Sequence, residues 1–249
     1  MCEPASFVVT KDRVFWSKIS DSHDRIIQEH QLYQYGVRGS NIVKVEISPR
    51  DKTFTIPLDK WDFYLDEDNN DLPEWFDQED IEKRCRVELC RWAQEKLFID
   101  RDAIIYNTCA YICGNSKVKA FNSKIEAHNN ANVEVHESNI TSYNNTIIDA
   151  GDKNYIYAFG NSKIKAQNYN HIEAYGRSKI EAMNYNFIMA YHDSQVSVFG
   201  SSVSLMYDNS KVTEARNGAI IKYLHFTRDP YKPQVGSDVD IINNYDEYK

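Results

Sequence analysis

The first chemistry that this sequence could hold is a nucleophile beside a base, close to the start of the chain. If Met1 is removed, Cys2 becomes the N-terminal residue, and its thiol could be activated by the free amine or by the imidazole of His23 or His30. An ordinary N-terminal cysteine without a catalytic role is the competing interpretation. Cys2 and His23 are therefore the catalytic candidates, and a non-enzymatic chain is the expectation that we prefer.

An acidic segment supplies the second candidate site. Residues 62–82 contain ten acids and neither Lys nor Arg. Five of their oxygen-bearing side chains match positions 1, 3, 5, 9 and 12 of a calcium loop: Asp66, Asp68, Asn70, Glu74 and Asp77. Position 6 is Asp71 where such loops need glycine, and Pro73 interrupts the segment. A solvated acidic loop is the alternative that we prefer, so no metal is expected.

Motifs that hold a cofactor are missing from the sequence. It has no phosphate-binding loop, no dinucleotide fingerprint, no HExxH and no GxSxG. We therefore expect no cofactor.

The elements that would position any site follow from an internal repeat. From residue 148 a branched apolar residue returns every eight positions, and a small apolar residue stands two places after each. The first set is Ile148, Ile156, Ile164, Ile172, Ile180, Ile188 and Val196, and the second runs from Ala150 to Val198. Two places before each anchor Asn alternates with Ser, so the full period is sixteen. Weaker copies reach back to Ile112 and forward through Val203, Val212 and Ile220.

A repeat of eight with paired apolar residues predicts short strands. Residues i and i+2 of a strand point to the same side, so each Ile–Ala pair faces inward, and Gly, Asn and Ser form the corners. The same pattern makes no helical stripe. We expect a right-handed parallel β-solenoid over residues 103–226, with two strands and about 16 residues per coil. Repeated Asn and Ser suit hydrogen-bonded ladders between coils.

The outward positions of the two half-repeats differ in chemistry. One half carries Lys, Gln, Glu and Ser, whereas the other half is rich in rings and methionine: Tyr155, Tyr157, Phe159, His171, Tyr175, Phe187, Met189 and Tyr191. Exposed apolar surface of this extent is typical of an interface. The N-terminal domain or a symmetry mate could cover it, or a different macromolecule could bind there. Stacking of bases or sugars is a third possibility, although no Lys/Arg groove is evident beside the rings. The third outward position could also turn inward at the corner.

The first hundred residues predict a different kind of domain. Residues 1–102 carry a net charge of −7 and predict an α+β head. We expect a hairpin over residues 6–17, a short helix ending near residue 31, strands over 42–48, 53–56 and 61–65, and a helix over about 78–98 that Asp77 caps. The tail over 227–249 is either a cap on the last coil or a free, acidic, Tyr-rich segment.

Charge and composition restrict the partners. The net charge of −8 argues against a nucleic-acid partner, and the sequence contains no run of 18 apolar residues that would predict a membrane span. Five cysteines without a secretion signal fit a reducing compartment, so we expect a cytoplasmic protein.

Two parts of the sequence carry a resemblance. The segments MCEPASFVVTKDRVFWSKISDSHDRIIQEH, IVKVEISP and LPEWFD resemble an uncharacterised protein family of bacteriophage genomes and bacterial mobile elements, over about residues 1–98. The octad repeat, seen in the segments AFGNSKIKA and AYGRSKIEA, resembles repeat arrays of phage and bacterial solenoid proteins. The resemblance implies a phage accessory or host-interaction protein and brings no catalytic residues with it.

Together these observations lead to one functional expectation. We expect a non-enzymatic phage-type accessory protein that binds a protein partner through the aromatic face, and that interferes with a host defence or metabolic factor. One alternative is a virion component, such as a fibre or decoration module, that forms a homo-oligomer through that face. Another is a small enzyme centred on the head, with Cys2 and His23.

Overall fold

The structure, a computed structural model, describes residues 4–32, 41–66, 72–224, 234–235 and 240–243. The chain divides into two compact units. Unit 1 comprises residues 1–98 and 108–110, and unit 2 comprises residues 99–107 and 111–249. No helix in the described ranges is both long and apolar enough to cross a membrane.

Unit 1 is built on a small antiparallel sheet with the order β2-β1-β3-β4. Its elements are β1 (Ser6–Val9), β2 (Val14–Phe15), α1 (His23–Glu29), β3 (Val43–Ser48), β4 (Asp62–Leu65) and α2 (Gln78–Lys96), with 3-10 turns at Arg50–Lys52 and Leu58–Lys60. The strand expected over residues 53–56 is not formed. The backbone N–H groups of Thr53, Phe54 and Ile56 donate to carbonyls two or three residues earlier, so this segment is a turn rather than a strand.

The long helix α2 begins where the sequence places it and ends slightly earlier. The Asp77 carboxylate accepts from the N–H groups of Glu79 and Asp80 at 3.0 and 3.2 Å, which is an N-cap. The helix ends two residues before the approximate end expected at residue 98, because Leu97 already has extended backbone and begins β5 (Leu97–Ile99). Near the end of α2, the fully buried Lys96 ammonium lies 2.7 Å from an Asp21 carboxylate oxygen, so the buried charge is paired.

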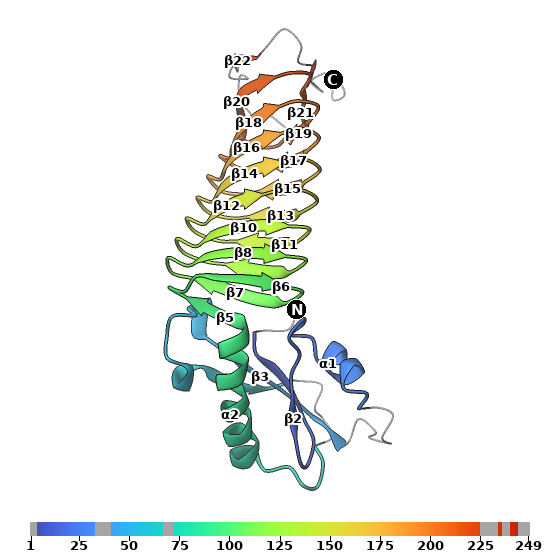
Figure 1. Ribbon diagram of the computed structural model, residues 1–249, viewed down its shortest axis with the longest axis vertical. Helices are drawn as coiled ribbons and strands as arrows, with labels where there is room; N and C mark the ends of the chain where they lie inside the picture. Colours follow the sequence, from blue (N-terminus) through green and yellow to red (C-terminus); the bar gives the residue numbers. More distant parts are fainter. Residues whose placement is uncertain (1–3, 33–40, 67–71, 225–233, 236–239, 244–249) are drawn as a thin grey trace. The chain divides into compact units, whose positions relative to one another are not determined.

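Unit 2 is a parallel β-solenoid of about eight turns, with about 16 residues per turn. Consecutive strands alternate between two sheets and stack in chain order (Figure 1). The even sheet contains β6 (Ala103–Tyr106), β8 (Lys117–Phe121), β10 (Asn132–His136), β12 (Ile147–Ala150), β14 (Lys163–Gln167), β16 (Lys179–Met183), β18 (Gln195–Phe199), β20 (Lys211–Arg216) and β22 (Gln234–Val235).

The odd sheet begins with β5 and continues through the strands between those of the even sheet. They are β7 (Cys109–Cys113), β9 (Lys124–Ala127), β11 (Asn139–Ser142), β13 (Tyr155–Ala158), β15 (His171–Ala174), β17 (Phe187–Ala190), β19 (Val203–Met206), β21 (Ile220–Tyr223) and β23 (Asp240–Asn243). Within the tail over 227–249, β22 and β23 therefore continue the two sheets.

The core of the solenoid consists of the predicted inward pairs in register. Ile148, Ile164 and Ile180 lie opposite one another on neighbouring strands and are buried, as are the alanines two residues later. Along the even sheet, each turn from Val118 to Ile148 takes fifteen residues, and each turn from Ile148 to Val212 takes sixteen. Burial alternates residue by residue along most of the strands, as the octad predicts.

The prediction that Val203 and Ile220 face the core is wrong. In β19 and β21 the inward residues are Ser204 and Met206, and Ile221 and Tyr223. Ser204 lies in register with Ile188, which is sixteen residues earlier. An extra residue in β20 shifts the next strand by one position, so that Ser204 pairs with Ile221. The apolar Val203 and Ile220 therefore point outward.

Side-chain ladders connect the turns at the strand starts. Asn154, Asn170 and Asn186 are almost completely buried, and the amide oxygen of each accepts the backbone N–H of the residue one turn earlier at 2.9–3.1 Å. Ser138 and Ser202 do the same with their hydroxyls. These bonds satisfy buried backbone donors that would otherwise be left without acceptors.

One corner needs glycine for a steric reason. Gly176 has φ +73, and a Cβ there would lie 2.9 Å from the Gly160 carbonyl oxygen of the turn below. The left-handed backbone and the close approach of the two turns both require a residue without a side chain.

Candidate binding surfaces

The catalytic candidate His23 is engaged on both ring nitrogens. It is 3% exposed, with Nε2 3.1 Å from the Val45 carbonyl oxygen and Nδ1 3.1 Å from an Asp66 carboxylate oxygen. These contacts tie α1 to β3 and to the end of β4. Cys2 lies outside the described residues, so the catalytic pair stays a prediction.

The predicted calcium ligands are only partly described. Asp68 and Asn70 lie outside the described residues, Asp66 contacts His23, and Asp77 caps α2. Glu74 is exposed. In the ranges that the structure describes, no group of three or more His, Cys, Asp or Glu side chains could hold a metal ion.

The outer face of the odd sheet carries the predicted aromatic surface. Tyr155 is 56% exposed and Tyr157 38% exposed, whereas the next two strands present half-buried His171, Phe187 and Met189. In one column the rings follow one another, with 5.7 Å between the Tyr155 and His171 centroids and 5.2 Å between those of His171 and Phe187.

This surface continues further than the sequence predicts. Val203, Leu205 and Ile220 also point outward on β19 and β21. We name the apolar face by its eight residues: Tyr155, Tyr157, His171, Phe187, Met189, Val203, Leu205 and Ile220. A strict count of sixteen from Ile188 leads to Ser204 as the inward residue, and that count is the signal that could have found the extension.

Glu173 is the acidic residue within the outline of the apolar face. Its carboxylate accepts from the Tyr175 hydroxyl at 2.8 Å and lies 3.4 Å from His171 Nε2. The Glu173 carboxylate therefore already has partners within unit 2, namely Tyr175 and His171, and is not a free acid in the apolar face.

The other three predicted aromatic residues lie at a corner and form a separate structure. Phe159, Tyr175 and Tyr191 belong to one stack of parallel rings, with 4.5–5.3 Å between successive centroids. The complete ring ladder is His128, Tyr143, Phe159, Tyr175, Tyr191 and Tyr207. Burial, and then the hydrogen bond to Glu173, raise the pKa of Tyr175 well above its usual range. The ring ladder is therefore mainly a means of joining turns, because each ring packs on the next.

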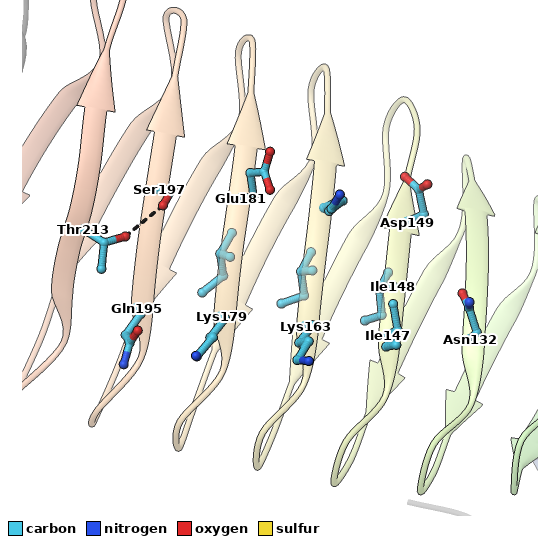
Figure 2. A pocket seen from close by; sticks show the side chains of 13 residues that line it. Asn132, Ile147, Ile148, Asp149, Lys163, Lys179, Glu181, Gln195, Ser197 and Thr213 are labelled. Atoms are coloured by element: carbon cyan, nitrogen blue, oxygen red, sulfur yellow. Dashed lines mark hydrogen bonds between the residues drawn. The ribbon is translucent and has the colours of Figure 1, made fainter.

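The even sheet carries a groove on its outer face that sequence reasoning missed. It has a volume of about 470 Å³. Figure 2 shows two rows of side chains across neighbouring strands, with Lys163 and Lys179 in one row and Asp149 and Glu181 in the other. The floor lies along Ile148, Ile164 and Ile180, whose side chains point into the core. The full lining adds Asn132, Ile147, Lys165, Gln195, Ser197 and Thr213.

The two solenoid faces therefore offer two different chemistries. The apolar face suits a partner that buries rings and aliphatic side chains, and the even-sheet groove suits a polar, charged ligand. In comparisons with known proteins, no protein-family model, no curated protein and no solved structure matches this chain.

Proposed function

We propose that this protein is a non-enzymatic binding protein that holds a protein partner on the apolar face. One observation carries the proposal: each of five adjacent strands of the odd sheet, β13 to β21, presents at least one apolar or aromatic side chain outward, and Glu173 and Lys222 are the charged residues among them. The inner faces of the same strands already form the solenoid core. The outer side chains are therefore not needed to bury a core within unit 2.

The energetics favour covering this surface. Removing apolar surface from water is worth about 25 cal/mol per Å², and interface centres are enriched in Tyr, Phe and Met. Tyr155 and Tyr157 are the most exposed members and keep polar hydroxyl tips, as interface tyrosines usually do. We infer that these two residues anchor the partner and that Leu205 and Ile220 complete the apolar contact.

The kind of partner rests on the resemblance of the head to phage proteins. We propose a cytoplasmic host protein, such as a defence or metabolic factor, with which this chain interferes. A second copy of the chain is the alternative, which would make it an oligomeric fibre or decoration module of a virion. We further propose that the coil is right-handed with two strands per coil, as the parallel pairing and the sixteen-residue step favour.

The experiment compares two sets of outward substitutions. Tyr155→Thr, Phe187→Thr and Leu205→Thr together make the apolar face polar while keeping β-propensity. Ile147→Thr is the matched control, because Ile147 is 43% exposed on the even sheet. Both proteins should keep the circular dichroism of the parent, since none of the four side chains points into the core.

Light scattering and affinity capture then separate the alternatives. An oligomer of the parent that becomes monomeric only in the triple variant assigns the face to self-assembly. A monomeric parent that captures a host protein, which the triple variant loses and Ile147→Thr keeps, supports the host-factor proposal. Unchanged mass and unchanged capture in the triple variant would overturn both.

A further inference from the structure

The even-sheet groove contains an electrostatic arrangement that the fold does not explain. Lys163 and Lys179 lie directly opposite each other on β14 and β16, and adjacent parallel strands are about 4.8 Å apart. Like charges in register destabilise a sheet. Elsewhere on the same sheet Lys119 is neutralised by Glu134 at 2.6 Å, whereas in the described part of the chain Lys163 and Lys179 lie within 4 Å of no carboxylate. An anion between the two ammonium groups would remove their repulsion.

The column that holds these lysines is cationic along the groove. In register, the successive side chains are Asn132, Ile147, Lys163, Lys179 and Gln195, none of them acidic. Asn132 and Gln195, at the two ends, offer amide groups that both donate and accept hydrogen bonds. This wall therefore suits a ligand edge that carries a small number of anionic groups between neutral polar ones.

The opposite wall has the complementary character. Its column runs through Asp149, Lys165, Glu181 and Ser197 in register. Ionised carboxylates only accept hydrogen bonds, so Asp149 and Glu181 suit hydroxyl donors and repel phosphates. A chain with a full charge on every unit, such as a nucleic acid, would place charges against both acids.

The dimensions indicate a linear ligand. Residues of six neighbouring strands, β10 to β20, line the groove, which corresponds to about 24 Å across the strands at their usual spacing. The volume of about 470 Å³ lies within the range of ligand sites. Because the strands repeat the same backbone spacing at every step, a linear polymer can lie across successive strands.

We propose that the even-sheet groove binds an acidic oligosaccharide, a hydroxyl-rich sugar chain with uronic-acid carboxylates. A carboxylate lies between Lys163 and Lys179, and sugar hydroxyls donate to Asp149 and Glu181. This inference is independent of the proposed function, because it concerns the other sheet and none of the residues of the apolar face.

The test is a titration of the full chain with matched oligomers, followed by calorimetry. The probes are a tetrasaccharide in which galacturonic acid alternates with galactose, called the galacturonate tetramer below, the all-galactose tetramer in which a hydroxymethyl group replaces each carboxylate, and linear tetraphosphate. We expect the galacturonate tetramer to bind at least about tenfold more tightly than either of the others, which is the scale of one good charge-assisted contact.

Three variants locate the site. Lys163→Gln with Lys179→Gln should weaken galacturonate binding at least about tenfold, and Asp149→Asn should weaken it through the hydroxyl contact. Lys117→Gln, on the same column but outside the groove, should leave it unchanged. If the double variant loses its circular dichroism, Lys179→Gln alone serves in its place.

Several results would overturn the proposal. They are absence of galacturonate binding, equal binding by the double lysine variant, or tighter binding of tetraphosphate than of galacturonate. The last result would assign the groove to a phosphate-bearing ligand instead. Loss of partner capture by the apolar-face variant would neither support nor weaken this proposal, so the two can fail separately.

Discussion

The buried asparagine ladder permits a prediction whose size can be worked out from its bonds. In Asn170→Ala, five hydrogen bonds of one side chain are lost. The amide oxygen accepts from the Asn154 N–H and Nδ2 at 3.0 and 2.8 Å, and Nδ2 donates to the carbonyls of Gln167 and Asn168 and to Asn186. The question is which of these groups finds another partner.

The largest cost comes from the Asn154 backbone N–H, which is buried and loses its acceptor. Leaving such a donor unsatisfied costs about 1–3 kcal/mol. The Asn154 side chain keeps three carbonyl partners, at Val135, Gly151 and Asp152, so its loss is smaller. With the two freed carbonyls and the small cavity, we expect Asn170→Ala to cost about 3 kcal/mol in free energy of unfolding.

The chain itself supplies the intermediate variant. At Ser138 and Ser202 a hydroxyl accepts the same type of backbone N–H at 3.0 and 3.1 Å. Asn170→Ser should therefore restore the acceptor for Asn154 and cost about half as much as the alanine variant.

The assay must report mainly on unit 2, whose two sheets contain most of the strands. All four tryptophans, Trp16, Trp61, Trp75 and Trp92, belong to unit 1, so tryptophan fluorescence follows the wrong unit. Urea unfolding followed by strand circular dichroism gives the free energy, and hydrogen exchange of the Asn154 amide gives the local effect. Asn161→Ala is the control, because Asn161 is exposed and substitutions of that kind usually stay within about 0.5 kcal/mol. Equal costs for Asn170→Ala and Asn161→Ala, or a serine variant no better than alanine, would refute the reasoning.

Two further predictions use matched pairs. Among the described residues, the buried Ser204 Oγ has no hydrogen-bond partner, so Ser204→Ala should stabilise the solenoid by about 1 kcal/mol in urea unfolding. Ser202→Ala should destabilise it, because it removes the acceptor of the Asn186 N–H. A stabilising Ser202→Ala or a destabilising Ser204→Ala would contradict this. The raised pKa of Tyr175 adds stability below the unfolded value of about 10, which is lost at higher pH. Melting temperatures from pH 8 to 11 should fall less steeply for Tyr175→Phe than for the parent, with Tyr155→Phe as the control.

The sequence is sufficient to predict the solenoid because the period of its apolar residues matches the alternation of side chains along a strand. Ile–Ala pairs at every eighth position specify which side chains are inward, and the Asn and Ser positions form the ladders that the repeat predicts. The error at Val203 has a definite cause. A slip of one residue moves every side chain of a strand to the other face. Choosing the apolar Val203 as the inward residue, instead of counting sixteen residues from Ile188 to Ser204, makes that slip.

Three features could not be predicted from a single segment of sequence: the turn at residues 53–56, the corner position of Tyr175 and the even-sheet groove. The segment 53–56 has strand-like residues, but local turn bonds satisfy its backbone between two prolines. The corner position of Tyr175 follows from the geometry of the turn, which the octad does not specify. Lys119 lies opposite Glu134, whereas Lys163 lies opposite Lys179, and which residues meet in this way depends on the register between strands that are far apart in the sequence.

The parallel ladders also determine how the solenoid would respond to mechanical load. Its main-chain hydrogen bonds run from turn to turn, across the strands, and the Asn and ring ladders run in the same direction. Tension along the stack would therefore load these bonds one turn after another, so that turns peel away from an end in sequence. Force applied along the strands would instead shear many bonds of a turn at once. The fold is consequently weak against tension along the stack and resistant to force along the strands. The direction in which an attached partner pulls would therefore determine how much force unfolds the solenoid.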